Sequence, residues 1–277
     1  MYRKKIIVNK YEEKTKNVLD AVVKKYDACL FPKTRVADAL QITNSGLSHN
    51  EYSYALKAHF DFVVSKKDST SEFAIEFDEP HHKFDEDAIR KDKLKNNICS
   101  KLELPLLRIT SDYLEKIGNF PTILSWITEL YFLQERFYLA QEQGQIPMDE
   151  PWLWFCLEGY DPFIHFRAFI EKTYEKGLCS DPIPHYISGS CDDRKSYTTL
   201  AVLKIKDNEY ITSLVECFAI NFYAIPPRMI STELAVCNVA KKLKKYIEGN
   251  TIITSTYPDI LEMKQDFVEK FSTNLHE

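Results

Sequence analysis

The sequence decides its fold in the stretch HFDFVV, residues 59–64, which is followed by a second stretch, FAIEFD, at residues 73–78. Both segments alternate apolar residues with polar or small ones, which is the pattern of a β-strand with one face against a core. A polar turn centred on residues 68–69 would join them into a hairpin. In that register Asp61 lies opposite Glu76, on the face that does not carry the phenylalanines.

The predicted pairing of Asp61 with Glu76 points to chemistry. Directly opposed Cβ atoms in a sheet lie roughly 5 Å apart. Two anions at that separation raise each other's pKa unless a cation lies between them. Hard oxygen ligands of this kind suit Mg²⁺ or Mn²⁺. The plain alternative is a solvated sheet face, but an acid pair there is unfavourable. We therefore expect a metal-dependent enzyme.

Composition sets limits on the class of protein. The chain has 277 residues, of which 44% are apolar and 28% charged, as in globular proteins. Its formal net charge of −5 gives no global basic field for nucleic acid, although a local basic groove remains compatible with it. Seven scattered cysteines without a CxxC pair predict reduced thiols and a cytoplasmic location rather than a disulfide framework. No apolar run reaches transmembrane length.

Periodicity and turn signals predict the order of elements. Helices are predicted over 10–26, 84–102, 121–143, 231–248 and 257–274. A strand followed by a short turn or helix is predicted in 28–40, the hairpin covers 59–78, and further strands are predicted in 105–109, 197–205 and 209–224. Residues 41–58 and 177–196 are expected to be irregular. The first half therefore has an α/β pattern. Residues 144–151 form the best linker, which divides the chain into domains at 1–143 and 150–277.

The helix predicted over 84–102 has charged residues in its apolar stripe. Asp92 and Lys95 lie in the middle of that stripe. Its apolar members are Phe84, Ala88, Cys99 and Leu102. Charged groups on a buried helix face are costly unless they are paired or needed. An ordinary surface pair at i, i+3 is the alternative. Glu12 lies at the edge of the apolar stripe of the helix predicted over 10–26.

These residues carry a family resemblance. In chain order the pattern reads Glu12, FPKTRVADAL at 31–40, FDFVV at 60–64, AIEFD at 74–78, His81-His82, Asp92-x-x-Lys95 and LPLLRI at 104–109. This order resembles the PD-(D/E)XK nuclease superfamily. Within it, the pattern is most similar to a bacterial domain family of unknown function that is close to the very-short-patch-repair endonucleases. The resemblance covers roughly residues 8–115.

The resemblance implies a role for each residue of the pattern. Asp61 and Glu76 would be the metal-binding carboxylates, and Glu12 would complete the site from the N-terminal helix. Asp78 stands where the superfamily motif has a lysine, two residues after Glu76. In related families a helix lysine takes that role, and Lys95 is the candidate here.

Three further residues belong to the predicted site. Asp78 and Asp92 are counted with the catalytic candidates because they lie beside the hairpin acids and Lys95. His82 matches the family's histidine better than His81 does. A loop pair that hydrogen-bonds only to backbone is the alternative for these histidines.

The resemblance also implies fold and activity. We expect a restriction-endonuclease-like α/β core, with a mixed sheet flanked by helices, followed by a smaller α+β accessory region. The expected activity is Mg²⁺-dependent or Mn²⁺-dependent hydrolysis of DNA phosphodiesters in bacterial defence, repair or mobile-element processing. Residues 150–277 are expected to select substrate, form a homodimer or bind a partner protein. The alternatives are a catalytically inactive binding module of the same fold and a transposon-end nuclease subunit that needs a transposase.

Overall fold

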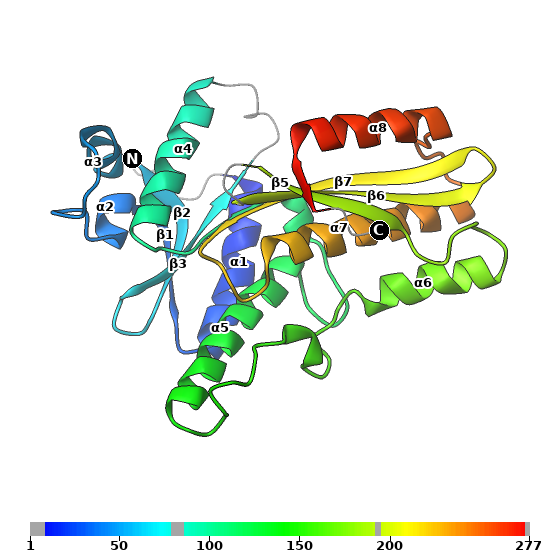
Figure 1. Ribbon diagram of the computed structural model, residues 1–277. Coiled ribbons are helices and arrows are strands. Elements are labelled where there is room, and N and C mark those ends of the chain that lie inside the picture. The colour runs from blue at the N-terminus through cyan, green and yellow to red at the C-terminus, as the bar shows by residue number, and fades with distance from the viewer. Residues whose placement is uncertain (1–8, 79–85, 192–194, 275–277) are drawn as a thin grey trace, which may run out of the picture. The chain divides into compact units, whose positions relative to one another are not determined.

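The computed structural model describes residues 9–78, 86–191 and 195–274 (Figure 1). These residues form two compact units. The first comprises the chain up to Trp154 together with Ala219–Ile225, and the second comprises Phe155–Phe218 and the chain from Pro226 onward. The predicted linker was residues 144–151; the first unit here also includes the short segment Ala219–Ile225 from later in the chain.

The first unit is a mixed sheet with helices. Its elements are α1 (Lys10–Lys25), β1 (Cys29–Arg35), α2 (Val36–Ala39), α3 (His49–Ala55), β2 (His59–Ser65), β3 (Ser71–Phe77), α4 (Glu86–Lys101), β4 (Leu106–Ile109), a 3₁₀ turn (Ser111–Leu114) and α5 (Ile123–Glu142). The strand order is β1-β2-β3-β4. The first two pairings are antiparallel, and β3 pairs with β4 in parallel. The expected α/β class with a mixed sheet and flanking helices is thus confirmed.

The hairpin of β2 and β3 has the predicted register. Its ladder pairs are Phe62–Ile75, Val63–Ala74 and Val64–Phe73. The turn is centred on Asp68 rather than between residues 68 and 69, because Lys66 N–H donates to Thr70 O at 2.8 Å. A bulge between Val64 and Ser65 absorbs this difference. The bulge therefore sets which face each carboxylate occupies.

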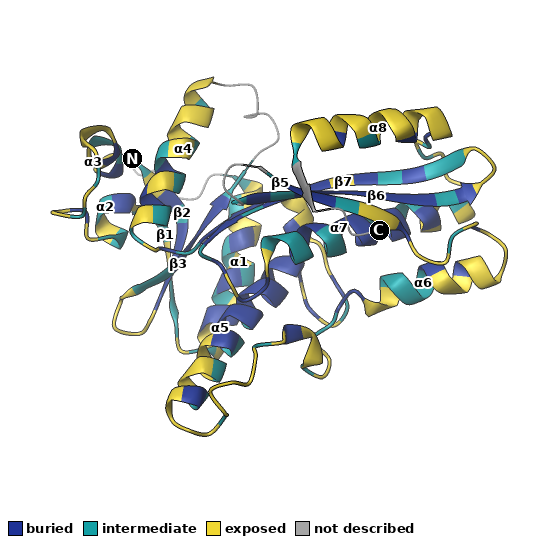
Figure 2. Cartoon of the chain, in the orientation of Figure 1, coloured by how far each residue is buried: buried dark blue, intermediate teal, exposed yellow. Residues whose placement is uncertain are grey.

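Helix ends in the first unit follow from local capping. In α1 the Asn9 side chain accepts from Tyr11 N–H, and acidic residues occupy the first turn. In α5 the N-cap is Thr122, which forms a capping box with Ser125. Pro121 therefore precedes the helix instead of opening it. The two helices pack together, and apolar residues of both lie in the core (Figures 1 and 2).

The second unit is built on an antiparallel sheet. Its elements are α6 (Ile164–Glu175), β5 (His185–Cys191), β6 (Ser196–Lys206), β7 (Glu209–Ile220, of which the last two residues belong to the first unit), α7 (Pro227–Ile247), α8 (Tyr257–Lys270) and β8 (Ser272–Asn274), and the strand order is β7-β6-β5-β8. The long hairpin of β6 and β7 turns at Asp207-Asn208, where Asn208 adopts a φ of 55°. The middle of β6 is buried, whereas β7 alternates buried residues with exposed or half-buried ones (Figure 2).

Three sequence-based expectations are wrong. Residues 41–58 contain α3, which begins with a capping box between Ser48 and Glu51. Residues 177–196 contain β5, a strand with small and polar residues that pairs with β6 along its length. The helix predicted to end near residue 274 ends at Lys270 and is followed by β8. No helix among the described residues combines the length and apolar character that a membrane crossing requires.

Candidate functional site

Asp61 and Glu76 meet where the hairpin ladder ends. The recorded ladder stops at Phe62–Ile75, and the two carboxylates continue the hydrogen bonding beyond it. Asp61 Oδ2 accepts from Phe77 N–H at 2.9 Å, and Glu76 Oε1 accepts from Asp61 N–H at 3.3 Å. Each acid is therefore held by the backbone of the opposite strand. This fixes both side chains in one place, as the predicted register requires.

Lys95 of α4 reaches Glu76. Its Nζ donates to Glu76 Oε2 at 2.7 Å and to the backbone oxygen of His59 at 2.9 Å. Both side chains are more than nine-tenths buried. Burial raises the pKa of Glu76 to about 7; Lys95 acts in the opposite direction and Asp61 in the same one. A buried carboxyl that titrates near neutrality suits a site that binds a cation or moves a proton.

Lys33 of β1 joins the other two predicted metal ligands. Its Nζ donates to Asp61 Oδ1 at 2.6 Å and to Glu12 Oε1 at 2.9 Å. Burial lowers the pKa of Lys33, but the hydrogen bonds to Asp61 and Glu12 outweigh it, so this pKa lies above its ordinary value. Glu12 is half-buried while its neighbour Glu13 is exposed, as its position at the edge of the helix stripe predicts.

Arg108 of β4 organises the remaining acids. Its guanidinium is buried and donates to Asp78 Oδ1 at 2.8 Å and to Asp92 Oδ1 at 3.0 Å. It also donates to Asn96 Oδ1 at 3.1 Å. Arg108 is the parallel ladder partner of Glu76, which places it beside the hairpin acids. Asp92 of α4 is therefore paired with Arg108 of β4, and not with Lys95 along the helix.

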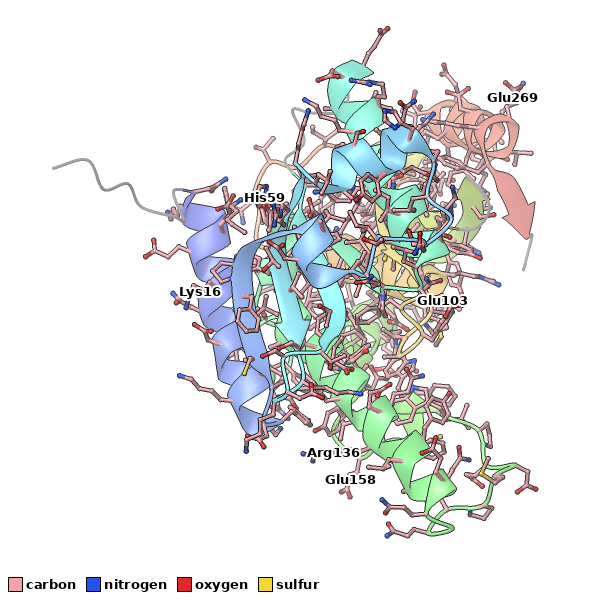
Figure 3. The ribbon with its side chains drawn as sticks, turned by 90° about the vertical axis from the view of Figure 1, so that its left-hand side faces the viewer. Lys16, His59, Glu103, Arg136, Glu158 and Glu269 are labelled. Carbon is pink, nitrogen blue, oxygen red and sulfur yellow. The ribbon has the colours of Figure 1, made fainter. Side chains whose placement is uncertain are left out.

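The predicted site residues thus fall into two linked groups. One contains Glu12, Asp61, Glu76 and Lys95, together with Lys33. The other contains Asp78 and Asp92, which Arg108 joins. His59 has an exposed side chain and contributes its backbone oxygen; Figure 3 labels it at the start of β2. His82 lies outside the described residues.

Sequence reasoning gave no role to Lys33, Arg108 or Tyr54. Lys33 could have been found from the pairing of β1 with β2, because it falls at the position opposite Asp61. Arg108 could have been found from the parallel pairing that sets it beside Glu76. Tyr54 lies in α3, which the sequence did not predict. Burial raises the pKa of Tyr54 to about 12, with Glu76 and Asp92 contributing.

The acids fit a small cation in part. One ammonium nitrogen already contacts Glu12 and Asp61, so their oxygens lie within reach of a single cation, and a second ammonium contacts Glu76. Carboxylate oxygens have two lone pairs each and can accept more than one partner. Within residues 9–78, 86–191 and 195–274, however, no group of three or more His, Cys, Asp or Glu side chains is placed so that it could hold a metal ion without rearrangement of side chains.

The first unit also has a cavity away from these acids. It has a volume of about 490 Å³ and is lined in part by Tyr131, Gln134 and Tyr138 of α5 and by Tyr223. None of the predicted site residues lines it. The hairpin acids instead lie around the ion pairs described above.

The comparisons with known proteins bear on the same part of the chain. Residues 4–120 match a family model described as a protein of unknown function, DUF2726. No curated protein and no solved structure matches the chain. The matched stretch contains the hairpin, α4 and every acid, lysine and arginine of the two linked groups. The candidate site therefore lies within the segment that matches this family.

Proposed function

We propose that the first unit is a restriction-endonuclease-like core and that the protein is a Mg²⁺-dependent or Mn²⁺-dependent endonuclease acting on DNA. The observation that carries the proposal is the contact of buried Lys95 with buried Glu76, beside Asp61. Two hairpin carboxylates and a lysine from the following helix are the set that the resemblance to PD-(D/E)XK nucleases implies. DNA as the substrate comes from that resemblance.

The side chains present have definite tasks in such a reaction. Asp61 and Glu76, with Glu12, would hold the metal ion, which when bound lowers the pKa of a water and offsets phosphate charge. Lys95 donates two of its three N–H groups to Glu76 and His59 O, which leaves one for a phosphate oxygen. A preorganised ammonium in a buried position stabilises developing charge better than one in water.

Asp78 and Asp92 act through Arg108 in this proposal. Asp78 occupies the motif position of the missing lysine. It pairs with Arg108, whereas Lys95 pairs with Glu76. The two aspartates hold the buried guanidinium beside Glu76. They are thus positioning residues, while Asp61, Glu76 and Lys95 contact substrate or cation.

The direct test is cleavage of plasmid, linear duplex and single-stranded DNA with Mg²⁺, Mn²⁺ or EDTA. We expect metal-dependent cutting by the wild type, and at least a hundredfold loss in Asp61→Ala and in Lys95→Met. Asp207→Ala, in an exposed turn, is the matched control and should cut normally. Nuclease activity that survives in Asp61→Ala would assign the cutting to a contaminant and refute the proposal.

A second candidate is a catalytically inactive binding module of the same fold. Two observations favour it: Asp78 replaces the motif lysine, and ammonium groups pair with Glu12, Asp61 and Glu76. Absence of both cutting and metal-induced stabilisation would support it. Metal-induced stabilisation without cutting would instead favour a nuclease subunit that needs a partner such as a transposase.

A further inference from the structure

Lys33 adopts an unusual backbone conformation at the site. Its φ is 50°, in the left-handed region, although it belongs to β1. The ladder with β2 is recorded on either side of it, at Pro32–Phe62 and Thr34–Phe60. Non-glycine residues rarely adopt this region, and such strain persists only where surrounding structure imposes it. The interruption lies directly opposite Asp61.

The side chain of Lys33 takes the place that a cation would occupy. Its one nitrogen contacts Glu12 and Asp61, from α1 and β2, at 2.9 and 2.6 Å. Two carboxylates from different elements would repel each other without such a bridge. The side chain of Lys33 is 34% exposed, whereas that of Lys95 is 8% exposed. Lys33 can therefore turn to solvent without unpacking the core, and Lys95 cannot.

We propose that Lys33 is a built-in competitor for the divalent cation. It neutralises Glu12 and Asp61 in the metal-free protein, and a cation binds between these acids only when the ammonium leaves. The inference rests on the proposed function, because it takes the same acids as metal ligands. It adds a determinant of metal affinity, because the cation must bind Glu12 and Asp61 more strongly than the ammonium group of Lys33 does.

Neutralisation of Lys33 then has two separate effects. Removal of the positive charge at Lys33 takes away the competitor and strengthens cation binding. The same removal leaves Glu12 and Asp61 facing each other, so the metal-free protein loses stability. Cation affinity rises while the stability of the metal-free protein falls. If Lys33 only linked α1 to the sheet, its neutralisation would lower the stability and leave the cation affinity unchanged.

The experiment is calorimetric titration of the full-length protein with Mn²⁺, without nucleic acid. We expect Lys33→Gln to bind Mn²⁺ about tenfold more tightly than the wild type, since an ion pair of moderate strength is removed from the competition. Lys33→Arg, which keeps the charge, should stay within threefold of the wild type. Lys67→Gln removes another lysine–aspartate pair, with Asp27, and is the matched control. It should leave the affinity unchanged.

Thermal melts supply the second readout. Metal-free Lys33→Gln should melt below the wild type, and Mn²⁺ should raise its melting temperature by more than it raises that of the wild type. Lys33→Met tests the same point if the glutamine variant does not fold. Equal or weaker Mn²⁺ binding by the neutral variants, or no binding by any variant, overturns the inference.

The two proposals can fail separately. Metal-dependent DNA cutting by the wild type, together with unchanged affinity in Lys33→Gln, overturns the role of Lys33 and leaves the nuclease in place. Tighter Mn²⁺ binding by Lys33→Gln without any DNA cutting supports the competitor and contradicts a nuclease that acts without a partner.

Discussion

At the scale of single residues, Glu76 is a carboxyl group whose ionisation the fold opposes. Its pKa is raised from 4.5 to about 7, chiefly by burial. Because the folded pKa lies above the unfolded one, the stabilising contribution is complete below pH 4.5 and is lost as the pH rises through 7. Glutamine does not titrate. The free energy of unfolding of Glu76→Gln, measured relative to that of the metal-free wild type, should therefore rise by on the order of 3 kcal/mol from pH 4 to pH 8.

Urea unfolding in the presence of EDTA at several pH values measures this difference. In the variant the contact of residue 76 with Lys95 involves no ionisation at that position and adds a constant offset to its curve, so only the pH dependence of the difference carries the prediction. Glu103→Gln, at an exposed position, is the control and should show no such trend. A stability difference that is flat from pH 4 to 8 would contradict a raised pKa.

The cysteines give a second prediction at this scale. Burial, with Glu76 nearby, raises the pKa of Cys99 to about 12, while Cys156 is exposed. Since the thiolate is the reactive form, iodoacetamide at pH 8 should label Cys156 within minutes and leave Cys99 unmodified until urea unfolds the protein. Peptide mass spectrometry reads out both sites. Comparable labelling rates in the native protein would contradict the buried position of Cys99.

The sequence could place some of these residues because alternation and helix periodicity report which side chains share a face. Asp61, Glu76 and Lys95 were found in that way. The contact of Lys33 with Asp61 could not be derived from periodicity, because it depends on a left-handed residue that interrupts β1. The bridge by Arg108 required the parallel pairing of β3 with β4, which is a long-range fact that local patterns do not contain.

At the scale of elements, the capping box of α3 allows the contribution of a single helix cap to stability to be measured. Ser48 Oγ accepts from Glu51 N–H, and Glu51 Oε2 accepts from Ser48 N–H at 2.8 Å. Ser48→Ala removes half of this capping box and should cost about 1 kcal/mol in urea unfolding. Ser53→Ala, inside the same helix, should cause no loss, since alanine is the better helix former. Equal losses for both variants would show that the cap contributes nothing of its own.

Element prediction succeeded where the pattern is long and failed where it is short. The hairpin register was right because apolar alternation on both strands outweighs a turn displaced by the bulge at Val64. The helix α3 was missed because it has seven residues and follows a turn signal at Asn44. The strand β5 was missed because its Gly189 and serines read as a loop, whereas its pairing with β6 comes from the tertiary structure.

At the scale of the whole molecule, the first unit depends on a segment that the linear division of the chain assigned elsewhere. Asn221 Nδ2 donates to Cys99 O at 3.4 Å, and Gln134 Nε2 donates to Tyr223 O at 3.1 Å. Trp152 Nε1 donates to Ala224 O at 2.8 Å. These bonds tie Ala219–Ile225 to α4, to α5 and to Trp152, all within the first unit. Removal of residues 150–277 would therefore also remove part of the unit that carries the site.

Phe222 is where this dependence can be measured. Its ring is 2% exposed and packs against Phe73 of β3 and Tyr131 of α5, with ring centroids 5.8 and 5.3 Å away. Phe222→Ala in the full-length chain should cost roughly 3–5 kcal/mol in urea unfolding, because truncation of a buried phenylalanine leaves a cavity. Phe155→Ala, where the ring is 52% exposed, should cost less than about 1 kcal/mol. If residues up to 143 formed a self-sufficient domain, the two variants would lose similar, small amounts of stability. A large loss in Phe222→Ala alone would show that the hairpin bearing Asp61 and Glu76 is stabilised by a segment more than a hundred residues further along the chain.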